Sequence, residues 1–193
     1  MELDLTARND TSAELTAQGL RASVDLLGAS DRTVVLGIGN PIMGDDGLGI
    51  HAIRDLQSTQ CEMSQSSSPI EFLDGGTLGY LLIDRLMGAE GLIVVDAANL
   101  GGEAGELKTL EGKDMDIFLT SNPKSSVHEV GLIDLLQMMD LAGHTPRRRA
   151  LVAVQPALID WGTDLTPAVA NSLVEVRQAV VGLLTNWYGG QLP

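Results

Sequence analysis

The sequence contains a single cysteine, Cys61, among its 193 residues. One cysteine cannot form an intrachain disulfide, and it cannot build a thiolate cage for zinc on its own. Any metal site within this chain must therefore use oxygen and imidazole ligands. A catalytic role for Cys61 is also disfavoured, because it lies in a polar, serine-rich segment with no cationic cluster that would favour the thiolate.

Basic residues are few, with 12 Lys and Arg against 26 Asp and Glu and a formal net charge of -14. Such a chain is repelled by nucleic acid phosphates and by an anionic membrane surface. Long apolar runs are also missing, since the stretches at residues 33–39 and 91–95 are far shorter than the ~20 residues that span a bilayer. The first thirty residues do not have the pattern of a secretory signal. The sequence predicts a cytoplasmic protein with neither nucleic acid nor a membrane as partner.

Length and periodicity predict one α/β domain over residues 31–193. Residues 1–30 have no clear period and are interpreted as a mobile or loosely attached N-terminal extension. Short apolar runs predict strands at residues 33–39, 70–73, 91–95 and 149–154, with an edge strand or hairpin arm at 106–110. Helices are predicted from residue 47, over 78–87, after Ser126 and from Pro167. This alternation indicates a mostly parallel sheet covered on both faces, with ligand sites beyond the carboxyl ends of its strands.

The segment from Gly37 to Gly47 lies between a predicted strand and a predicted helix, where phosphate-binding loops occur. A dinucleotide fingerprint requires glycine where this chain has Ile42, and Asp45-Asp46 replaces the Lys-Ser or Lys-Thr of a P-loop. Two carboxylates would repel a triphosphate, so no nucleotide cofactor is predicted. One aspartate is expected to cap the following helix, while the other is either solvated or faces a cleft.

Two more aspartates and a histidine complete a candidate metal site. Asp74 and Asp96 end the second and third predicted strands, so with Asp46 three successive turns would bring a carboxylate to one edge of the sheet. His128 lies in the first turn of a predicted helix, where the helix dipole favours the neutral imidazole that binds metal. Asp46, Asp96 and His128 would make a three-ligand set for a divalent ion such as zinc or nickel. Each residue also has an ordinary interpretation as a loop-forming aspartate or a surface histidine. The two other histidines are assigned to that interpretation: His51 and His144.

Five short motifs stand in order along the chain: Gly37-Ile38-Gly39-Asn40, Asp45-Asp46-Gly47-Leu48-Gly49, Leu73-Asp74-Gly75-Gly76-Thr77, Val95-Asp96-Ala97 and His128-Glu129-Val130-Gly131-Leu132. Their order and spacing, within residues 32–184, resemble the maturation proteases of NiFe hydrogenases. The resemblance implies a three-layer α/β sandwich of the phosphorylase/hydrolase-like type, with a twisted, mostly parallel sheet between helices.

The same resemblance implies an endopeptidase that removes the C-terminal extension of the hydrogenase large-subunit precursor after nickel insertion. Asp46, Asp96 and His128 would bind nickel presented by this substrate. Asp46 and Asp74 would be catalytic, Asp74 by orienting substrate or assisting proton transfer. Glu is also found in the family where this chain has Asp46, so the carboxylate here reaches about one methylene less far. The metal could act on the scissile carbonyl or on water, or anchor the substrate while a carboxylate serves as base.

Two other functions are compatible with these residues. One is a zinc-dependent hydrolase of small amides or peptides, which would carry its own metal. The other is a non-catalytic assembly factor that binds metal or nucleotide. Metal content separates the first from the maturation protease, and the mass of the precursor after incubation separates the second.

Overall fold

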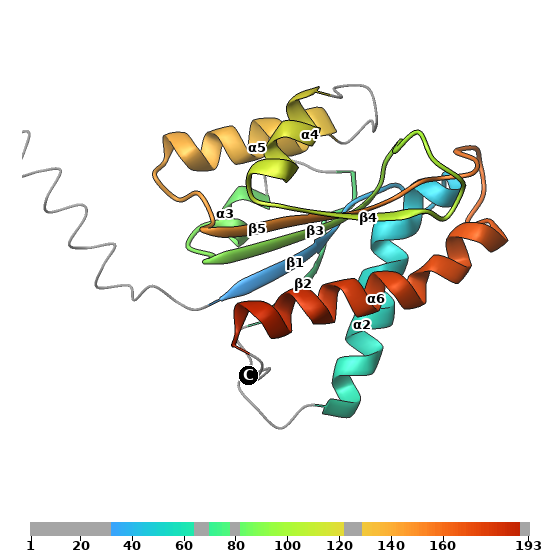
Figure 1. The fold of residues 1–193 in the computed structure, drawn as a ribbon, viewed down its shortest axis with the longest axis horizontal. Coiled ribbons are helices and arrows are strands. Elements are labelled where there is room, and N and C mark those ends of the chain that lie inside the picture. The colour runs from blue at the N-terminus through green and yellow to red at the C-terminus, as the bar shows by residue number, and fades with distance from the viewer. Residues whose placement is uncertain (1–31, 64–69, 78–81, 122–128, 190–193) are drawn as a thin grey trace, which may run out of the picture. The chain divides into compact units, whose positions relative to one another are not determined.

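The computed structural model describes residues 32–63, 70–77, 82–121 and 129–189 (Figure 1). The predicted N-terminal extension and His128 lie outside these residues, so both remain predictions. Within the described part of the chain, no helix has the length and apolar character needed to cross a bilayer.

Five strands form one sheet in the order β2-β1-β3-β5-β4. Their bounds are Thr33–Gly37 for β1, Ile70–Asp74 for β2, Gly91–Ala97 for β3, Leu107–Glu111 for β4 and Arg148–Val154 for β5. All neighbours are parallel except β4, which runs antiparallel to β5 at the edge. Every residue of β1 and β3 is buried, as expected for central strands covered on both faces. The predicted mostly parallel sheet is confirmed.

Helices cover both faces of this sheet. Their bounds are Gly44–Gly47 for the 3-10 helix η1, Leu48–Met63 for α2, Ile83–Leu86 for α3, Lys113–Ser121 for α4, Glu129–Leu141 for α5 and Pro167–Trp187 for α6. In Figure 1, α2 and α6 lie on one side of the sheet, while α4 and α5 lie on the other. Alternate residues of β3 accordingly belong to two cores, with Leu92 and Val94 in one and Ile93 and Val95 in the other. The structure is a three-layer α/β sandwich.

Several elements differ from their sequence-based predictions, among them β1, which ends at Gly37 and not at residue 39. Strand β3 continues two residues beyond 95, so Asp96 lies within the strand and not after it. Helix α3 ends at Leu86, one residue before the predicted end at 87, and residues 78–81 of that prediction lie outside the described part of the chain. Helix α4 was not predicted, because its buried residues are only Met115 and Leu119, which is too few to make a helical stripe visible.

Gly49 lies where the first turn of α2 crosses the ends of β1 and β3. A Cβ atom there would be 2.2 Å from the carbonyl oxygen of Ile38 and 2.5 Å from that of Val95. Both are backbone atoms, so the strands or the helix would have to move. We expect Gly49→Ala to lower the free energy of unfolding by roughly 3 kcal/mol, measured by urea denaturation.

Gly182 provides the matched control for this prediction, because it too is a helical glycine, in α6, but its Cβ would meet nothing within 4 Å. Gly182→Ala should raise the free energy of unfolding by about 0.5–1 kcal/mol, since alanine is the better helix former. Equal effects of the two substitutions would contradict the close approach at Gly49.

Candidate active site

The predicted carboxylates Asp74 and Asp96 lie on strands that end at the carboxyl edge of the sheet, on either side of β1. Gly37, the last residue of β1, pairs with Asp74 of β2 on one side and with Val95 of β3 on the other. The next residue of β3 is Asp96. Adjacent strands are ~4.8 Å apart, so the backbones at Asp74 and Val95 are separated by about 10 Å. Asp46 follows β1 in the loop and short helix that connect it to α2.

The loop after β1 folds back on itself and so fixes the position of Asp46. Gly39 has a φ of 141°, and a Cβ there would lie 1.9 Å from the carbonyl oxygen of Asp46, so only glycine allows this approach. The backbone N–H of Asn40 then donates to Oδ2 of Asp46 at 2.9 Å. The result is a carboxylate that is only 5% exposed and has a defined orientation.

Asp45 does not cap the helix that follows it, although the sequence led us to expect that one aspartate of the Asp45-Asp46 pair would do so. Its carboxylate is fully buried and instead accepts hydrogen bonds from the segment between β5 and α6. Oδ2 accepts from the N–H of Ala157 at 2.9 Å and of Leu158 at 3.1 Å, and Oδ1 accepts from the N–H of Thr166 at 2.7 Å. The Thr166 hydroxyl also donates to Oδ2, at 2.9 Å. Thr166 is the N-cap residue of α6, but its hydroxyl makes no cap hydrogen bond.

Asp96 and Asp74 leave the sheet on opposite faces. Asp96 is 1% exposed and follows the alternation of Leu92 and Val94, which places it on the face covered by α3, α4 and α5. The side chain of Asp74 is 52% exposed, and its Oδ2 lies 4.0 Å from Nη2 of Arg54 in α2, on the other face. Its Oδ1 accepts from the N–H of Gly76 at 3.0 Å. Asp74 therefore has a different environment from the two buried aspartates.

The predicted metal set is only partly within the described residues. In that part of the chain, no three His, Cys, Asp or Glu side chains form a group that could hold a metal ion. The third predicted ligand, His128, lies outside it. The other two are buried carboxylates: Asp96 lies near the end of β3, and Asp46 lies in η1, which follows the adjacent strand β1. Their oxygen atoms have the donor chemistry that a divalent cation requires.

His51 differs from the surface histidine that the sequence suggested. Its ring is partly buried, and its Nε2 atom is enclosed without a hydrogen-bond partner among the described residues. A Cβ on Gly47 would lie 3.5 Å from Cδ2 of His51, so the ring is beside the loop that carries Asp46. The sequence signal that could have predicted this position is the four-residue spacing from Gly47 to His51, which is about one helical turn.

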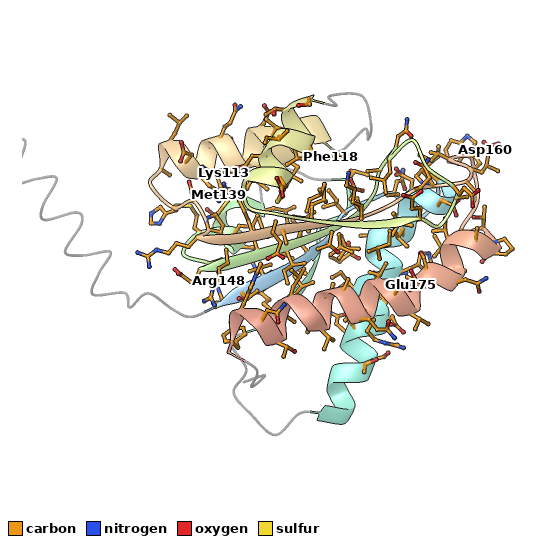
Figure 2. All side chains as sticks on the ribbon, in the orientation of Figure 1. Lys113, Phe118, Met139, Arg148, Asp160 and Glu175 are labelled. Atoms are coloured by element: carbon orange, nitrogen blue, oxygen red, sulfur yellow. The ribbon has the colours of Figure 1, made fainter. Side chains whose placement is uncertain are left out.

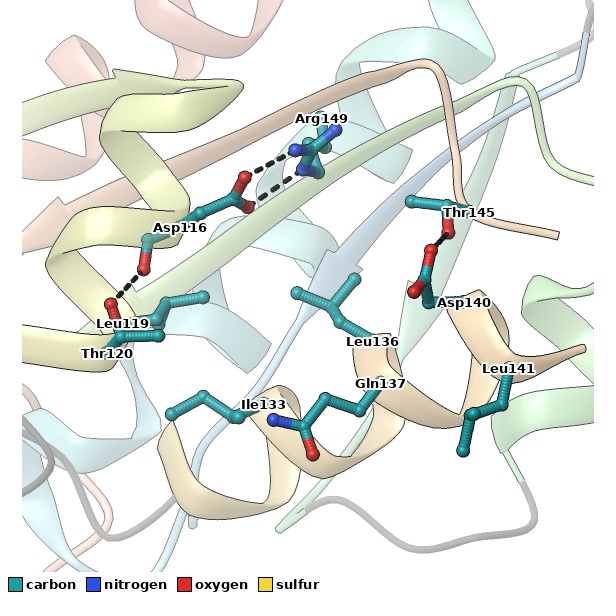
Figure 3. A pocket seen from close by; sticks show the side chains of 10 residues that line it. All are labelled: Asp116, Leu119, Thr120, Ile133, Leu136, Gln137, Asp140, Leu141, Thr145 and Arg149. Atoms are coloured by element: carbon teal, nitrogen blue, oxygen red, sulfur yellow. Dashed lines mark hydrogen bonds and ion pairs between the residues drawn. The ribbon is translucent and has the colours of Figure 1, made fainter. Parts of the chain in front are cut away.

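A separate pocket of about 450 Å³ lies between α4, α5 and the start of β5 (Figure 3). Within it, Nε of Arg149 donates to Oδ1 of Asp116 at 2.9 Å, and this hydrogen bond raises the pKa of the Arg149 guanidinium. Asp96 pairs with Ala153 of β5. Arg149 lies four residues before Ala153 in the same strand, so the backbones at Arg149 and Ala153 are about 13 Å apart. The pocket is therefore distinct from the carboxylate edge.

Known proteins resemble this chain over most of its length. A family model described as hydrogenase maturation protease matches residues 50–183, a range that includes Asp74 and Asp96 but begins after Asp46. The hydrogenase expression/formation protein HupD of Bradyrhizobium diazoefficiens is 34% identical over 158 residues, which are 81% of this chain and 80% of HupD. HupD of Rhodobacter capsulatus is 36% identical over 158 residues, 81% of this chain and 73% of that protein.

Solved structures agree with the sequence comparisons. The hydrogenase maturating endopeptidase HybD from Escherichia coli superimposes with a TM-score of 0.71 and 28% identity, covering 80% of this chain and 93% of HybD. The carboxylate-bearing edge thus occurs in a fold shared with a known endopeptidase. This chain is a peptidase and belongs to the hydrogenase maturation protease family.

Proposed function

We propose that this protein is a cytoplasmic endopeptidase that removes the C-terminal extension from the large-subunit precursor of a NiFe hydrogenase after nickel insertion. The observation that supports this most directly is a pair of buried carboxylates in a member of this family: Asp96 near the end of β3, and Asp46 in the short helix η1 that follows the adjacent strand β1. A carboxylate that is shielded from water is stabilised by a bound cation, so a cation-binding role would suit these two side chains.

Nickel carried by the precursor is the cation that we assign to this site. Asp46, Asp96 and His128 would bind it as substrate, and no nucleotide takes part. Asp46 would also serve as the base that accepts a proton from water as the water attacks the scissile carbonyl carbon. The proton then passes to the leaving amide nitrogen, so the peptide bond is cut without any other reactant. Nickel recognition would restrict cleavage to precursors that have already received their metal.

The decisive experiment compares nickel-loaded and nickel-free precursor, each incubated with the purified protein and analysed by mass spectrometry. We expect loss of the C-terminal peptide from the nickel-loaded form only. An unchanged mass of the nickel-loaded form would contradict the proposal and would favour a non-catalytic assembly factor. Metal analysis of the purified protein tests the other alternative, because stoichiometric zinc would indicate a conventional zinc hydrolase.

Asp74 is assigned the smaller role of orienting the substrate peptide, because its side chain is half exposed and its strand β2 ends beside β1 at the carboxyl edge of the sheet. We expect Asp74→Asn to slow processing by about 10-fold, since asparagine can still accept the hydrogen bond from Gly76 but lacks the charge. Asp84→Asn on α3, also exposed, is the control and should have no effect. The measurement is the initial rate of mass change, and equal rates for the two variants would exclude Asp74 from the reaction.

A further inference from the structure

Four large apolar side chains are exposed on the two loops that meet beside Asp46. They form what we call the apolar patch: Ile42, Leu158, Ile159 and Trp161. Trp161 has the most exposed side chain of the four, at 78%. Single exposed apolar residues are ordinary on protein surfaces, whereas a group of them on adjoining loops commonly marks a binding site.

The two loops are joined by backbone hydrogen bonds, so the residues of the patch lie on adjoining segments. The N–H of Gly162 donates to the carbonyl of Ile42 at 3.1 Å, and the N–H of Gly44 donates to the carbonyl of Gly162 at 2.8 Å. A third bond runs from the N–H of Asp45 to the carbonyl of Leu158 at 3.3 Å. Beneath them, the buried Asp45 carboxylate holds the second loop at both ends. A surface held in this way loses little conformational entropy on binding.

The charge around the patch has one sign. Neither residues 38–53 nor residues 155–166 contain a lysine or arginine. Asp160, which is labelled in Figure 2, and Asp164 are both exposed on the second loop, between β5 and α6. A complementary partner has an apolar centre bordered by basic groups. A second copy of this chain does not fit, because two acidic rims on chains of net charge -14 would repel each other.

We propose that the apolar patch binds the folded part of the hydrogenase large-subunit precursor. The C-terminal segment that is cut would bind elsewhere, at the carboxylates. This inference rests on the proposed function. The patch is continuous with the candidate site, since Ile42 precedes Asp46 by four residues in the same loop. A precursor whose peptide reaches Asp46 and Asp96 must therefore contact these loops. Trp161 is the expected anchor, because an exposed tryptophan that becomes buried contributes strongly to protein binding.

The test is to measure precursor binding and processing for two patch variants, Trp161→Ser and Leu158→Ser, in the full chain. We expect Trp161→Ser to raise both the Kd and the KM for nickel-loaded precursor by about 30-fold, with kcat lowered less than about twofold. Leu158→Ser should raise them by about 5-fold. The Kd is obtained by titrating labelled protease with precursor, so binding is measured independently of cleavage.

Leu141→Ser is the matched control for Leu158→Ser. Leu141 is 89% exposed and Leu158 is 59% exposed, so the same change is made on two accessible leucines. Leu141 ends α5 and precedes the start of β5, whereas the patch follows the end of β5, so the two sites lie at opposite ends of that strand. Leu141→Ser should leave Kd and KM unchanged.

Each outcome separates the docking surface from the proposed function. Processing that is equally efficient in the wild type and both patch variants would overturn the docking surface and leave the protease function intact. Binding that depends on Trp161 without any cleavage would overturn the protease function and keep the surface. No binding by the wild type, an equal loss in Leu141→Ser, or wild-type dimers that Trp161→Ser dissociates in sedimentation would each overturn the surface.

Discussion

Replacement of Asp96 by asparagine is expected to reduce kcat/KM for precursor processing by at least ~1,000-fold, or about 4 kcal/mol of transition-state stabilisation. Asparagine has nearly the same volume as aspartate, so the packing around this 1% exposed side chain in β3 is kept. What is lost is the negative charge that would bind the cation of the substrate. The measurement combines the initial rate of mass change with thermal unfolding, in which the variant should remain close to the wild type.

Asparagine is a better choice than alanine at this position. Asp96 lies at the edge of the sheet but is buried within the strand, so alanine would leave a cavity and confuse a loss of stability with a loss of chemistry. Asp46→Asn and His128→Ala should have effects of similar size if the three residues act as one ligand set. The comparison variant is Asp74→Asn, for which about 10-fold is expected. Full activity of Asp96→Asn in a folded protein would remove Asp96 from the site.

Replacement of Asp45 by alanine is expected to lower the free energy of unfolding by about 4 kcal/mol, the largest stability effect that we predict. The alanine side chain cannot accept hydrogen bonds, so the N–H groups of Ala157, Leu158 and Thr166 lose their acceptor. Asp45→Asn keeps one acceptor oxygen and should lose about half as much. Urea denaturation gives the free energies. Hydrogen exchange should accelerate at these three amides before it does in α5.

Asp160→Ala is the control for Asp45→Ala. Asp160 is an exposed aspartate in the same loop region, and its Oδ1 accepts only from the N–H of the adjacent Trp161, at 2.7 Å. Its removal should change the free energy of unfolding by no more than about 0.5 kcal/mol. If Asp45→Ala were as mild as this control, the hydrogen bonds of the Asp45 carboxylate could not be what holds the two loops together.

The positions of the strands and the burial of the central ones were predictable, because short β-branched runs that end in glycine or aspartate are typical of central parallel strands. β1, β2, β3 and β5 begin within one residue of their predicted starts. Helix α4 was not predictable from periodicity, since it buries only Met115 and Leu119. A nine-residue helix with so few apolar contacts depends on tertiary packing.

The sequence predicts aspartates near the carboxyl ends of β1, β2 and β3, but it does not predict their different environments. Asp45 and Asp46 are adjacent, and no local pattern distinguishes the one that holds the loops from the one that faces the candidate site. The difference arises from partners 112 to 121 residues away, which only the folded chain brings to Asp45. Likewise, the opposite faces taken by Asp74 and Asp96 follow from strand register, which the sequence alone does not specify.

The long sequence separation between Asp45 and Thr166 also determines when the active conformation can form during translation. The ribosome must add 121 residues after Asp45 before its hydrogen bond to Thr166 can form. Until then the loop that carries Asp46 has its local contacts but lacks the hydrogen bonds that join it to the segment between β5 and α6. A nascent chain, or one that terminates before α6, is therefore expected to be inactive, so that proteolytic competence is acquired only near the end of translation.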